Sequence, residues 1–155
     1  MVEYRLNSAS EAEIAEHLRR CDASFVPPLS ERVAIEAYAK KIASTATRFE
    51  AWSGGTLVAL VASYCNDRKN WISYITSVSV LGDRQGTGIA GRLMRQCIEH
   101  ARALGMREVR LEVARDSLLA TKLYERHGFV AAKGSLRFCN MTLCLSGAED
   151  HDQRA

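Results

Sequence analysis

The most informative stretch of the sequence is Val78-Ser-Val-Leu-Gly-Asp-Arg-Gln-Gly-Thr-Gly-Ile-Ala-Gly91. It begins as an apolar strand, passes through a glycine-rich turn and continues as the start of a helix. Backbone N–H groups at a helix N-terminus lack partners within the helix, and the helix dipole adds partial positive charge there. Gly86, Gly88 and Gly91 carry no side chain, so an anion can approach this backbone closely. The segment therefore favours a phosphate group, although an ordinary strand-to-helix turn would use the same residues.

Two familiar nucleotide motifs do not account for this turn. A P-loop requires a glycine followed by lysine, and the sequence contains no Gly-Lys pair. A dinucleotide-binding unit opens the chain with a parallel strand–helix–strand arrangement, whereas here three strands of antiparallel character come first. The turn must therefore serve a different phosphate ligand, or none.

Strands precede the turn and a helix follows it. Gly54 and Gly55 can adopt positive φ angles, which indicates a hairpin between the first two strands. Apolar residues recur at helical spacing after Gly88, and Gly105 ends that helix. The predicted elements are strands at 48–52, 57–65 and 71–81, a helix at 90–104 and a strand at 108–114.

The N-terminal third is predicted to hold a short strand at 2–6 and two helices. The first helix ends near Cys21, and Pro27 and Pro28 interrupt the chain because proline cannot continue a helix. The second helix is expected at 31–44. Its buried side would hold Ala34, Tyr38 and Ile42. Two capping boxes could start the first helix, Ser8 with Glu11 or Ser10 with Glu13.

The C-terminal part is predicted to hold a short helix followed by two strands. Asp116 or Ser117 would cap this helix, which runs to Arg126 and stops at Gly128. The strands are expected at 129–133 and 136–145. Because antiparallel hairpins come before a strand–helix–strand crossover, the fold class is α/β (α+β), with a mixed sheet of six to seven strands and about four helices. Residues 1–146 form one domain, and 147–155 form a frayed polar tail.

Composition limits the function. The chain has 155 residues, of which 47% are hydrophobic and 25% charged, as in a single globular domain. No apolar run approaches a membrane span, and residues 1–7 carry charge where a signal peptide would be apolar. The net charge is only +3 and the basic residues are scattered, so no nucleic-acid partner is indicated. We expect a cytoplasmic protein that does not enter a membrane, and homodimer formation stays open.

The cysteines do not indicate a disulfide framework or a metal site. Their number is odd, and the sequence contains no C-x-x-C pair. Most have apolar neighbours, where cysteine behaves as a small hydrophobic residue. No metal site is therefore predicted. The five residues are Cys21, Cys65, Cys97, Cys139 and Cys144.

Two motifs together resemble the GNAT superfamily of acyl-CoA N-acyltransferases. Gln85-Gly-Thr-Gly88-Ile-Ala90 is similar to the family's Gln/Arg-x-x-Gly-x-Gly/Ala signature. Ala120-Thr-Lys-Leu-Tyr124-Glu-Arg-His-Gly128-Phe129 is similar to its second motif, a Leu-Tyr pair before Gly-Phe. The resemblance implies a GNAT-like fold, acetyl-CoA as acyl donor and its pyrophosphate at 85–91. Many members have asparagine seven residues before the tyrosine, where this chain has Ser117, whose hydroxyl reaches less far.

The resemblance also implies the residues that bind the donor. They follow from the two motifs and from the strand that precedes the first one. These residues are Val78, Ser79, Val80, Gln85, Gly86, Thr87, Gly88, Ile89, Ala90, Gly91, Ser117 and Tyr124.

Catalysis of acetyl transfer would involve Tyr124 and Glu112. The resemblance makes Tyr124 the acid that protonates the leaving thiolate, although it could be a core tyrosine beside Leu123. Glu112 alternates with two apolar neighbours on its strand and would face away from them. Its spacing from Tyr124 resembles the ribosomal-protein alanine N-acetyltransferases, in which this glutamate is the base. A structural carboxylate is the alternative.

Other residues could assist or replace Glu112. A water molecule held by Tyr74, Thr76 or Ser77 could serve as the base instead. His127 falls in the last turn of its helix, where a cation is favourable, and is interpreted as structural.

The acceptor is expected beside residues 24–32, between the first two helices. Phe25 and the neighbouring prolines could form an apolar wall there, and Arg32 could meet an anionic group; the same residues could merely pack the joint. The favoured function is transfer of acetyl to a primary amine of a small molecule, such as an amino sugar, amino acid or antibiotic. A protein N-terminal acetyltransferase and a non-catalytic acyl-CoA sensor are the alternatives.

Overall fold

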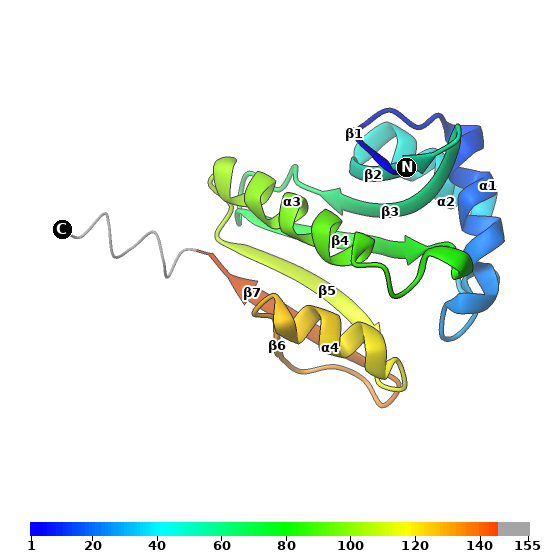
Figure 1. Cartoon of the computed structure of the whole chain (residues 1–155). Coiled ribbons are helices and arrows are strands. Elements are labelled where there is room, and N and C mark those ends of the chain that lie inside the picture. The colour runs from blue at the N-terminus through cyan, green and yellow to red at the C-terminus, as the bar shows by residue number, and fades with distance from the viewer. Residues whose placement is uncertain (146–155) are drawn as a thin grey trace.

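The computed structural model describes residues 1–145, which form one mixed sheet with helices on both faces (Figure 1). The strand order is β1-β2-β3-β4-β5-β7-β6, and β4 and β5 run parallel. This confirms the predicted fold class. The polar tail predicted at 147–155 lies outside the described residues. The strands are β1 Glu3–Leu6, β2 Thr47–Ser53, β3 Thr56–Tyr64, β4 Ile72–Val80, β5 Glu108–Ala114, β6 Val130–Ala131 and β7 Phe138–Cys144. The helices are α1 Glu11–Cys21, α2 Ile35–Thr45, α3 Ile89–Ala103 and α4 Leu118–Arg126, with 3₁₀ turns η1 Asp22–Ser24, η2 Leu29–Glu31 and η3 Gly82–Arg84.

Two apolar cores fill the space between the sheet and its helices. The first includes Leu93 of α3, Leu111 of β5 and Tyr124 of α4. The second joins α1 and α2 to the sheet and includes Ile42 and Leu60. Figure 1 shows α3 across the front of β3 and β4. Since successive strand residues point to opposite faces, each strand can supply both cores, and the sheet separates an α3–α4 side from an α1–α2 side.

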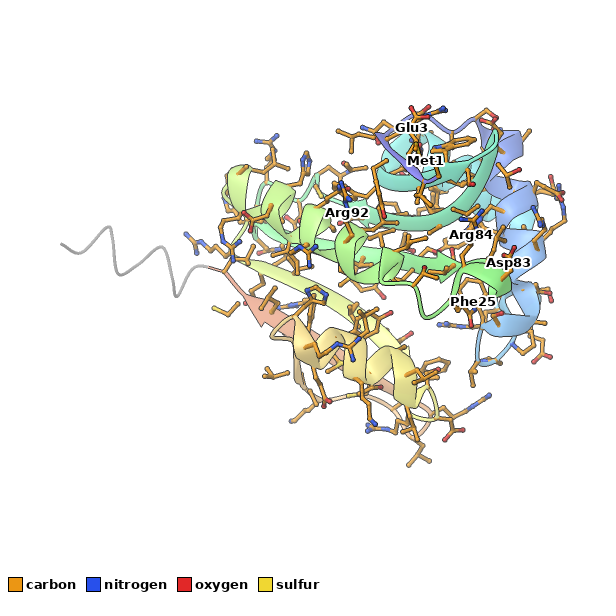
Figure 2. The ribbon with its side chains drawn as sticks, in the orientation of Figure 1. Met1, Glu3, Phe25, Asp83, Arg84 and Arg92 are labelled. Atoms are coloured by element: carbon orange, nitrogen blue, oxygen red, sulfur yellow. The ribbon has the colours of Figure 1, made fainter. Side chains whose placement is uncertain are left out.

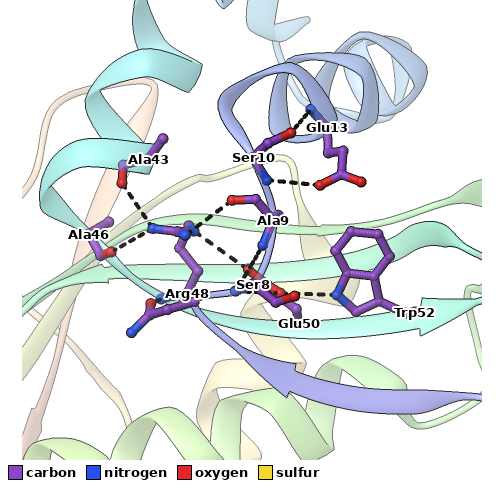
Figure 3. Close-up of polar contacts among 10 residues, drawn as sticks. Ser8, Ala9, Ser10, Glu13, Ala43, Ala46, Arg48, Glu50 and Trp52 are labelled. Atoms are coloured by element: carbon purple, nitrogen blue, oxygen red, sulfur yellow. Dashed lines mark hydrogen bonds and ion pairs between the residues drawn. The ribbon is translucent and has the colours of Figure 1, made fainter.

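A buried charged network ties both N-terminal helices to β2 (Figure 3). The Glu50 carboxylate is fully buried and accepts hydrogen bonds from the backbone of Ser8 and Ala9 and from Trp52 Nε1. Arg48 Nε lies 3.5 Å from this carboxylate. Because a buried charge is costly unless it is paired and hydrogen-bonded, the network fixes where α1 begins and α2 ends. The Arg48 guanidinium also donates to the carbonyl oxygens of Ala9, Ala43 and Ala46.

The first helix starts at one of the two predicted capping boxes. The Ser10 hydroxyl accepts from the Glu13 N–H at 3.1 Å, and the Glu13 carboxylate accepts from the Ser10 N–H at 2.9 Å. Each side chain satisfies one backbone N–H group that the helix cannot. Ser10 is therefore the N-cap, and the pair of Ser8 with Glu11 is not used.

The second helix starts later than the predicted position, residue 31. Asp22 accepts hydrogen bonds from the backbone N–H and the hydroxyl of Ser30, both at 2.7 Å, and residues 29–31 form the turn η2 instead. Ala34 is an extended and exposed N-cap rather than the buried residue that was predicted. Ile42 is buried as predicted. A local side-chain hydrogen bond has displaced the helix start, as short polar residues often do.

The last two strands are shorter than the predicted ranges 129–133 and 136–145. The segment between them turns back on β7, where the Ser135 N–H donates to the Phe138 carbonyl at 2.9 Å. Gly134 lies against the Phe138 backbone so closely that a Cβ there would clash. This turn removes 132–137 from the ladder.

Candidate active site

The glycine-rich turn joins β4 to α3 through η3. Gly86 and Gly88 have φ angles of +79° and +84°, which other residues adopt only with strain. A Cβ at either position would meet no atom within 4 Å, so the space above this backbone is open. Gly88 is the N-cap of α3 and provides no side-chain cap, and the first turn of α3 contains no acidic residue. Unpaired N–H groups, open space and an absence of negative charge in that turn suit an anion.

Side chains of the turn are used to hold its shape. The Thr87 hydroxyl donates to the Arg84 carbonyl at 2.5 Å, and the Gln85 amide donates to the Val80 carbonyl at 3.2 Å. The Arg84 guanidinium reaches the Ser53 hydroxyl at 2.9 Å and so ties the turn to the β2–β3 hairpin. Figure 2 shows Arg84 at the C-terminal end of β4. Nothing in the sequence distinguished Arg84 from other surface arginines.

Strands β4 and β5 separate beyond their first residues. Their parallel pairing covers Ile72 to Tyr74 of β4, whereas β4 continues to Val80. Opposite β3, Thr76 is an extra residue, because Ala62 pairs with Ser77 and Ser63 with Ile75. Such a bulge changes the direction of side chains. From Ile75 onward β4 has no β5 partner, so its backbone groups on this edge are open to a ligand.

His17 of α1 fixes one of the predicted donor-binding residues. Its Nδ1 lies 2.9 Å from the Leu57 carbonyl and its Nε2 lies 2.8 Å from the Ser79 hydroxyl. Because a carbonyl only accepts, Nδ1 carries the proton and Nε2 accepts from Ser79. Burial lowers the pKa of His17 to about 4, so the imidazole stays neutral. The Ser79 hydroxyl is therefore engaged with α1, and a ligand would meet the Ser79 backbone.

His17 was not predicted to be a site residue. It lies between Ile14 and Leu18 on the apolar face of α1, and its position on that face is the signal that could have identified it. Its partner Ser79 is distant in sequence, so the contact itself could not be read from the pattern.

Tyr124 is buried in the first core. Its ring meets Phe129 edge-on, with 6.1 Å between the ring centroids. Burial raises the pKa of the phenol above its ordinary value of 10, so the hydroxyl keeps its proton at neutral pH. Across residues 1–145 this hydroxyl makes no hydrogen bond, and a donor proton is thus uncommitted. The environment accordingly fits both a core tyrosine and an acid.

Glu112 faces the other side of the sheet. Leu111 and Val113 are buried in the first core, and Glu112 points away from them, as the alternation predicted. Its Oε1 lies 3.1 Å from the Nη2 of Arg32, which belongs to the link between η2 and α2. Arg32 also lies 4.5 Å from the Phe138 ring of β7. The structure therefore places Glu112 with Arg32 and does not bring it onto the face that holds Tyr124.

Hydroxyl groups from α2, β3 and β4 line the sheet beside Glu112. The Tyr38 hydroxyl lies 2.6 Å from the Thr76 carbonyl and 2.7 Å from the Thr76 hydroxyl. Tyr74 is paired with Tyr64 in the β3–β4 ladder, so both side chains share this face. Burial, followed by the Glu112 charge, raises the pKa of Tyr74. Sequence analysis named Tyr74 and Thr76 here but missed Tyr38 and Tyr64.

Ser117 and His127 lie at the two ends of α4. Ser117 is the N-cap, one of the two predicted positions, but its side chain makes no cap hydrogen bond. His127 lies against the first turn of α3, since a Cβ on Gly91 would be 3.8 Å from its Nε2. Burial, with Arg95 and Arg126 nearby, lowers the pKa of His127. The structural role that the sequence indicated for His127 stays a prediction.

Between Met1 and Leu145, no three His, Cys, Asp or Glu side chains gather as a metal ion would require. Within that part of the chain, no helix has the length and apolar character needed to cross a membrane.

A known protein family matches most of the chain. The sequence pattern of the Acetyltransferase (GNAT) family matches residues 12–129. None of the curated proteins matches the chain significantly.

Solved structures resemble nearly the whole chain. The PaiA N-acetyltransferase of Thermoplasma acidophilum, in complex with coenzyme A, has a TM-score of 0.71 at 14% identity, covering 93% of this chain and 99% of its own. The yncA protein of Salmonella typhimurium, solved with its cofactor acetyl-CoA, has a TM-score of 0.73 at 15% identity, covering 93% and 94%. The ribosomal-protein-S18-alanine N-acetyltransferase of Escherichia coli has a TM-score of 0.74 at 18% identity, covering 92% and 94%. At these identities the matches establish the fold.

Proposed function

Because the chain belongs to the acetyltransferase (GNAT) family, we propose that it transfers an acetyl group from acetyl-CoA to a primary amine of a small molecule. The observation that carries the proposal is the turn at 85–91, whose backbone is open to an anion directly beside the gap between β4 and β5. Two solved structures of similar fold contain coenzyme A or acetyl-CoA, which supports the identity of the donor.

The donor would lie on the α3–α4 side. Its pyrophosphate would meet the N–H groups at the start of α3, where the helix dipole favours negative charge. Its pantetheine arm would pair with the open edge of β4 and with Ser117, which keeps its hydroxyl free of capping. The Val80 carbonyl already accepts a hydrogen bond from the Gln85 side chain. Val80 would therefore contact the donor through a group other than its carbonyl. The proposed donor-binding set remains Val78, Ser79, Val80, Gln85, Gly86, Thr87, Gly88, Ile89, Ala90, Gly91, Ser117 and Tyr124.

The chemistry requires two proton transfers. Acetyl-CoA, when bound, supplies the acetyl thioester. An ammonium acceptor first loses one proton to a base, and its nitrogen then bonds to the acetyl carbon while the carbon–sulfur bond breaks. Tyr124, protonated because it is buried, passes its proton to the leaving sulfur. The second proton, released as the amide forms, restores Tyr124 through solvent, so one proton is released in total.

Glu112 is proposed as the base that receives the first proton. It is a carboxylate on the α1–α2 side, close to the open part of β5. A water molecule held by Tyr74, Thr76 or Ser77 is the alternative, because these groups border the same gap. The two candidate bases predict different pH dependences of kcat/KM for the Glu112→Gln variant, and steady-state kinetics can measure them.

A small acceptor is favoured over a protein chain by the contacts of Arg32. This residue reaches from the joint of α1 and α2 to Glu112 of β5 and to Phe138 of β7. These contacts would narrow the side of the sheet on which the acceptor is expected, which suits a small amine better than an extended peptide. Acetylation of a protein N-terminus remains the second candidate, since the fold and the spacing of Glu112 and Tyr124 resemble those of a ribosomal-protein alanine N-acetyltransferase.

A screen of acceptors tests the proposal. The protein is incubated with acetyl-CoA and with amino sugars, amino acids, aminoglycosides or peptides that begin with alanine. Free thiol release and the mass of the product are then measured. Small amines should be acetylated and release one thiol per product. Acetylation of peptides alone would move the function to the second candidate. Binding of acetyl-CoA without turnover of any amine would indicate a sensor.

A further inference from the structure

The acceptor side carries an ion pair that is open to solvent. The side chains of Arg32 and Glu112 are 43% and 35% exposed, and they come from segments that are distant in sequence. Two guanidinium groups lie near the Phe138 ring, Arg32 at 4.5 Å and Arg137 at 6.0 Å. A guanidinium group is planar and suited to bind a carboxylate. In this structure the carboxylate that Arg32 binds is that of Glu112.

The sheet beside this pair offers hydroxyl groups that the fold does not use. Ser77 Oγ and Tyr64 Oη are buried, and neither has a hydrogen-bond partner in the part of the chain that the structure describes. A buried hydroxyl without a partner costs free energy, so a polar ligand that bonds to it would be stabilised. Both residues share the face of the sheet that holds Tyr74. The charges of Glu112 and Arg32 both act on the pKa of the Tyr74 phenol, which places that phenol near the ion pair. The sheet face beside the Arg32–Glu112 pair is therefore polar.

We propose that the acceptor is a small zwitterion, an amine that also carries a carboxylate, and that it inserts between Arg32 and Glu112. Its carboxylate takes the place of Glu112 on the Arg32 guanidinium, and its ammonium takes the place of Arg32 beside Glu112. This inference rests on the proposed function and specifies the substrate class of the same site. The acceptor's carboxylate pairs with Arg32 and its ammonium pairs with Glu112, so neither side chain is left without an opposite charge.

The insertion has consequences for both side chains. Arg32 determines specificity, because an amine without a carboxylate has nothing to offer its guanidinium. Glu112 is released from Arg32 as the acceptor binds, next to the proton that must leave. The ion pair thus keeps the base engaged until an acceptor of the right chemistry enters.

Kinetics with matched acceptors test the inference. Initial rates are measured with L-amino acids, with their methyl esters and with the corresponding amines that lack the carboxylate. The wild-type protein should favour the amino acid over its ester by about 10- to 100-fold in kcat/KM, the range of one charge-assisted hydrogen bond. In Arg32→Ala this preference should fall to about twofold or less, because kcat/KM should fall much further for the amino acid than for its ester. The acetyl-CoA KM should not change.

Arg137→Ala is the matched control, since Arg137 also lies near Phe138 but forms no ion pair with Glu112. It should keep the preference for the carboxylate. Equal loss in both arginine variants would show a general positive field and overturn the inference. So would turnover of amines without a carboxylate preference in the wild type, which leaves the proposed function intact. Bound acetyl-CoA without turnover of any amine would overturn the proposed function, and the inference with it.

Discussion

Replacing Gly88 by alanine distinguishes the contribution of the turn to stability from its contribution to acetyl-CoA binding. The φ angle of Gly88 is +84°, and a Cβ there meets no protein atom within 4 Å, so the cost within the protein is conformational alone. A left-handed conformation costs a non-glycine residue about 1–2 kcal/mol, and the alanine recovers part of this by restricting the unfolded chain. A net loss of about 1 kcal/mol should lower the melting temperature by about 2–4 °C for a domain of this size.

Gly105→Ala is the matched control for this change. Gly105 follows the other end of α3, its φ angle is +83°, and a Cβ there also meets no atom within 4 Å. The two variants should therefore lose similar stability. Only Gly88→Ala places a methyl group where the pyrophosphate would approach, so only it should weaken acetyl-CoA binding, by about 10-fold or more, equivalent to about 1.4 kcal/mol.

The assay is thermal unfolding paired with titration calorimetry against acetyl-CoA, at a temperature where each variant is fully folded. Equal affinity in the wild type and both variants would refute the reasoning, because the turn would then serve the fold alone. Equal weakening in both variants would also refute it, since stability rather than position would set the affinity.

The remaining predictions concern three side chains. Tyr124→Phe should lower kcat by about 10²- to 10⁴-fold with little change in the acetyl-CoA KM, as stopped assays at saturating donor can show, because it removes a proton donor that acts in the transition state. Glu112→Gln should lower kcat/KM at neutral pH, and high pH should partly restore it as free amine accumulates; a pH–rate profile of wild-type shape would leave a water on β4 as the base. Since the pKa of His17 is lowered from 6.5 to about 4 in the folded protein, the unfolded chain alone binds its proton between these values. Acidification through this window should therefore lower the free energy of unfolding by up to about 3 kcal/mol, and His17→Asn should flatten that part of a melting-temperature curve against pH.

Local patterns predicted most of the fold. The change from strand to helical periodicity after Gly88 located β4 and α3, and Gly54 with Gly55 located the hairpin before them. The two candidate capping boxes placed the start of α1 within two residues, and the structure uses the one formed by Ser10 and Glu13. These signals depend on residues close together in sequence, and they were correct because tertiary contacts did not oppose them.

Contacts between distant residues could not be predicted in this way. Arg32 and Glu112 come together because the joint of α1 and α2 folds onto β5, and no periodicity encodes that approach. His17 of α1 reaches Ser79 of β4 for the same reason: α1 packs on that face of the sheet. The start of α2 was misplaced because Asp22 bonds to Ser30 and holds the intervening chain in a turn. In that last case a side-chain hydrogen bond overrides a local preference.

Hydrogen exchange with and without acetyl-CoA reports directly whether the donor binds at the turn 85–91. At saturating acetyl-CoA, peptides that contain residues 85–91 should lose exchange at their backbone amides, because these N–H groups would bond to the pyrophosphate. Peptides from the β2–β3 hairpin around Gly54 and Gly55, which is also a glycine turn, should be unaffected. Protection of 85–91 is the expected result. Binding of acetyl-CoA with protection elsewhere, and none at 85–91, would contradict it.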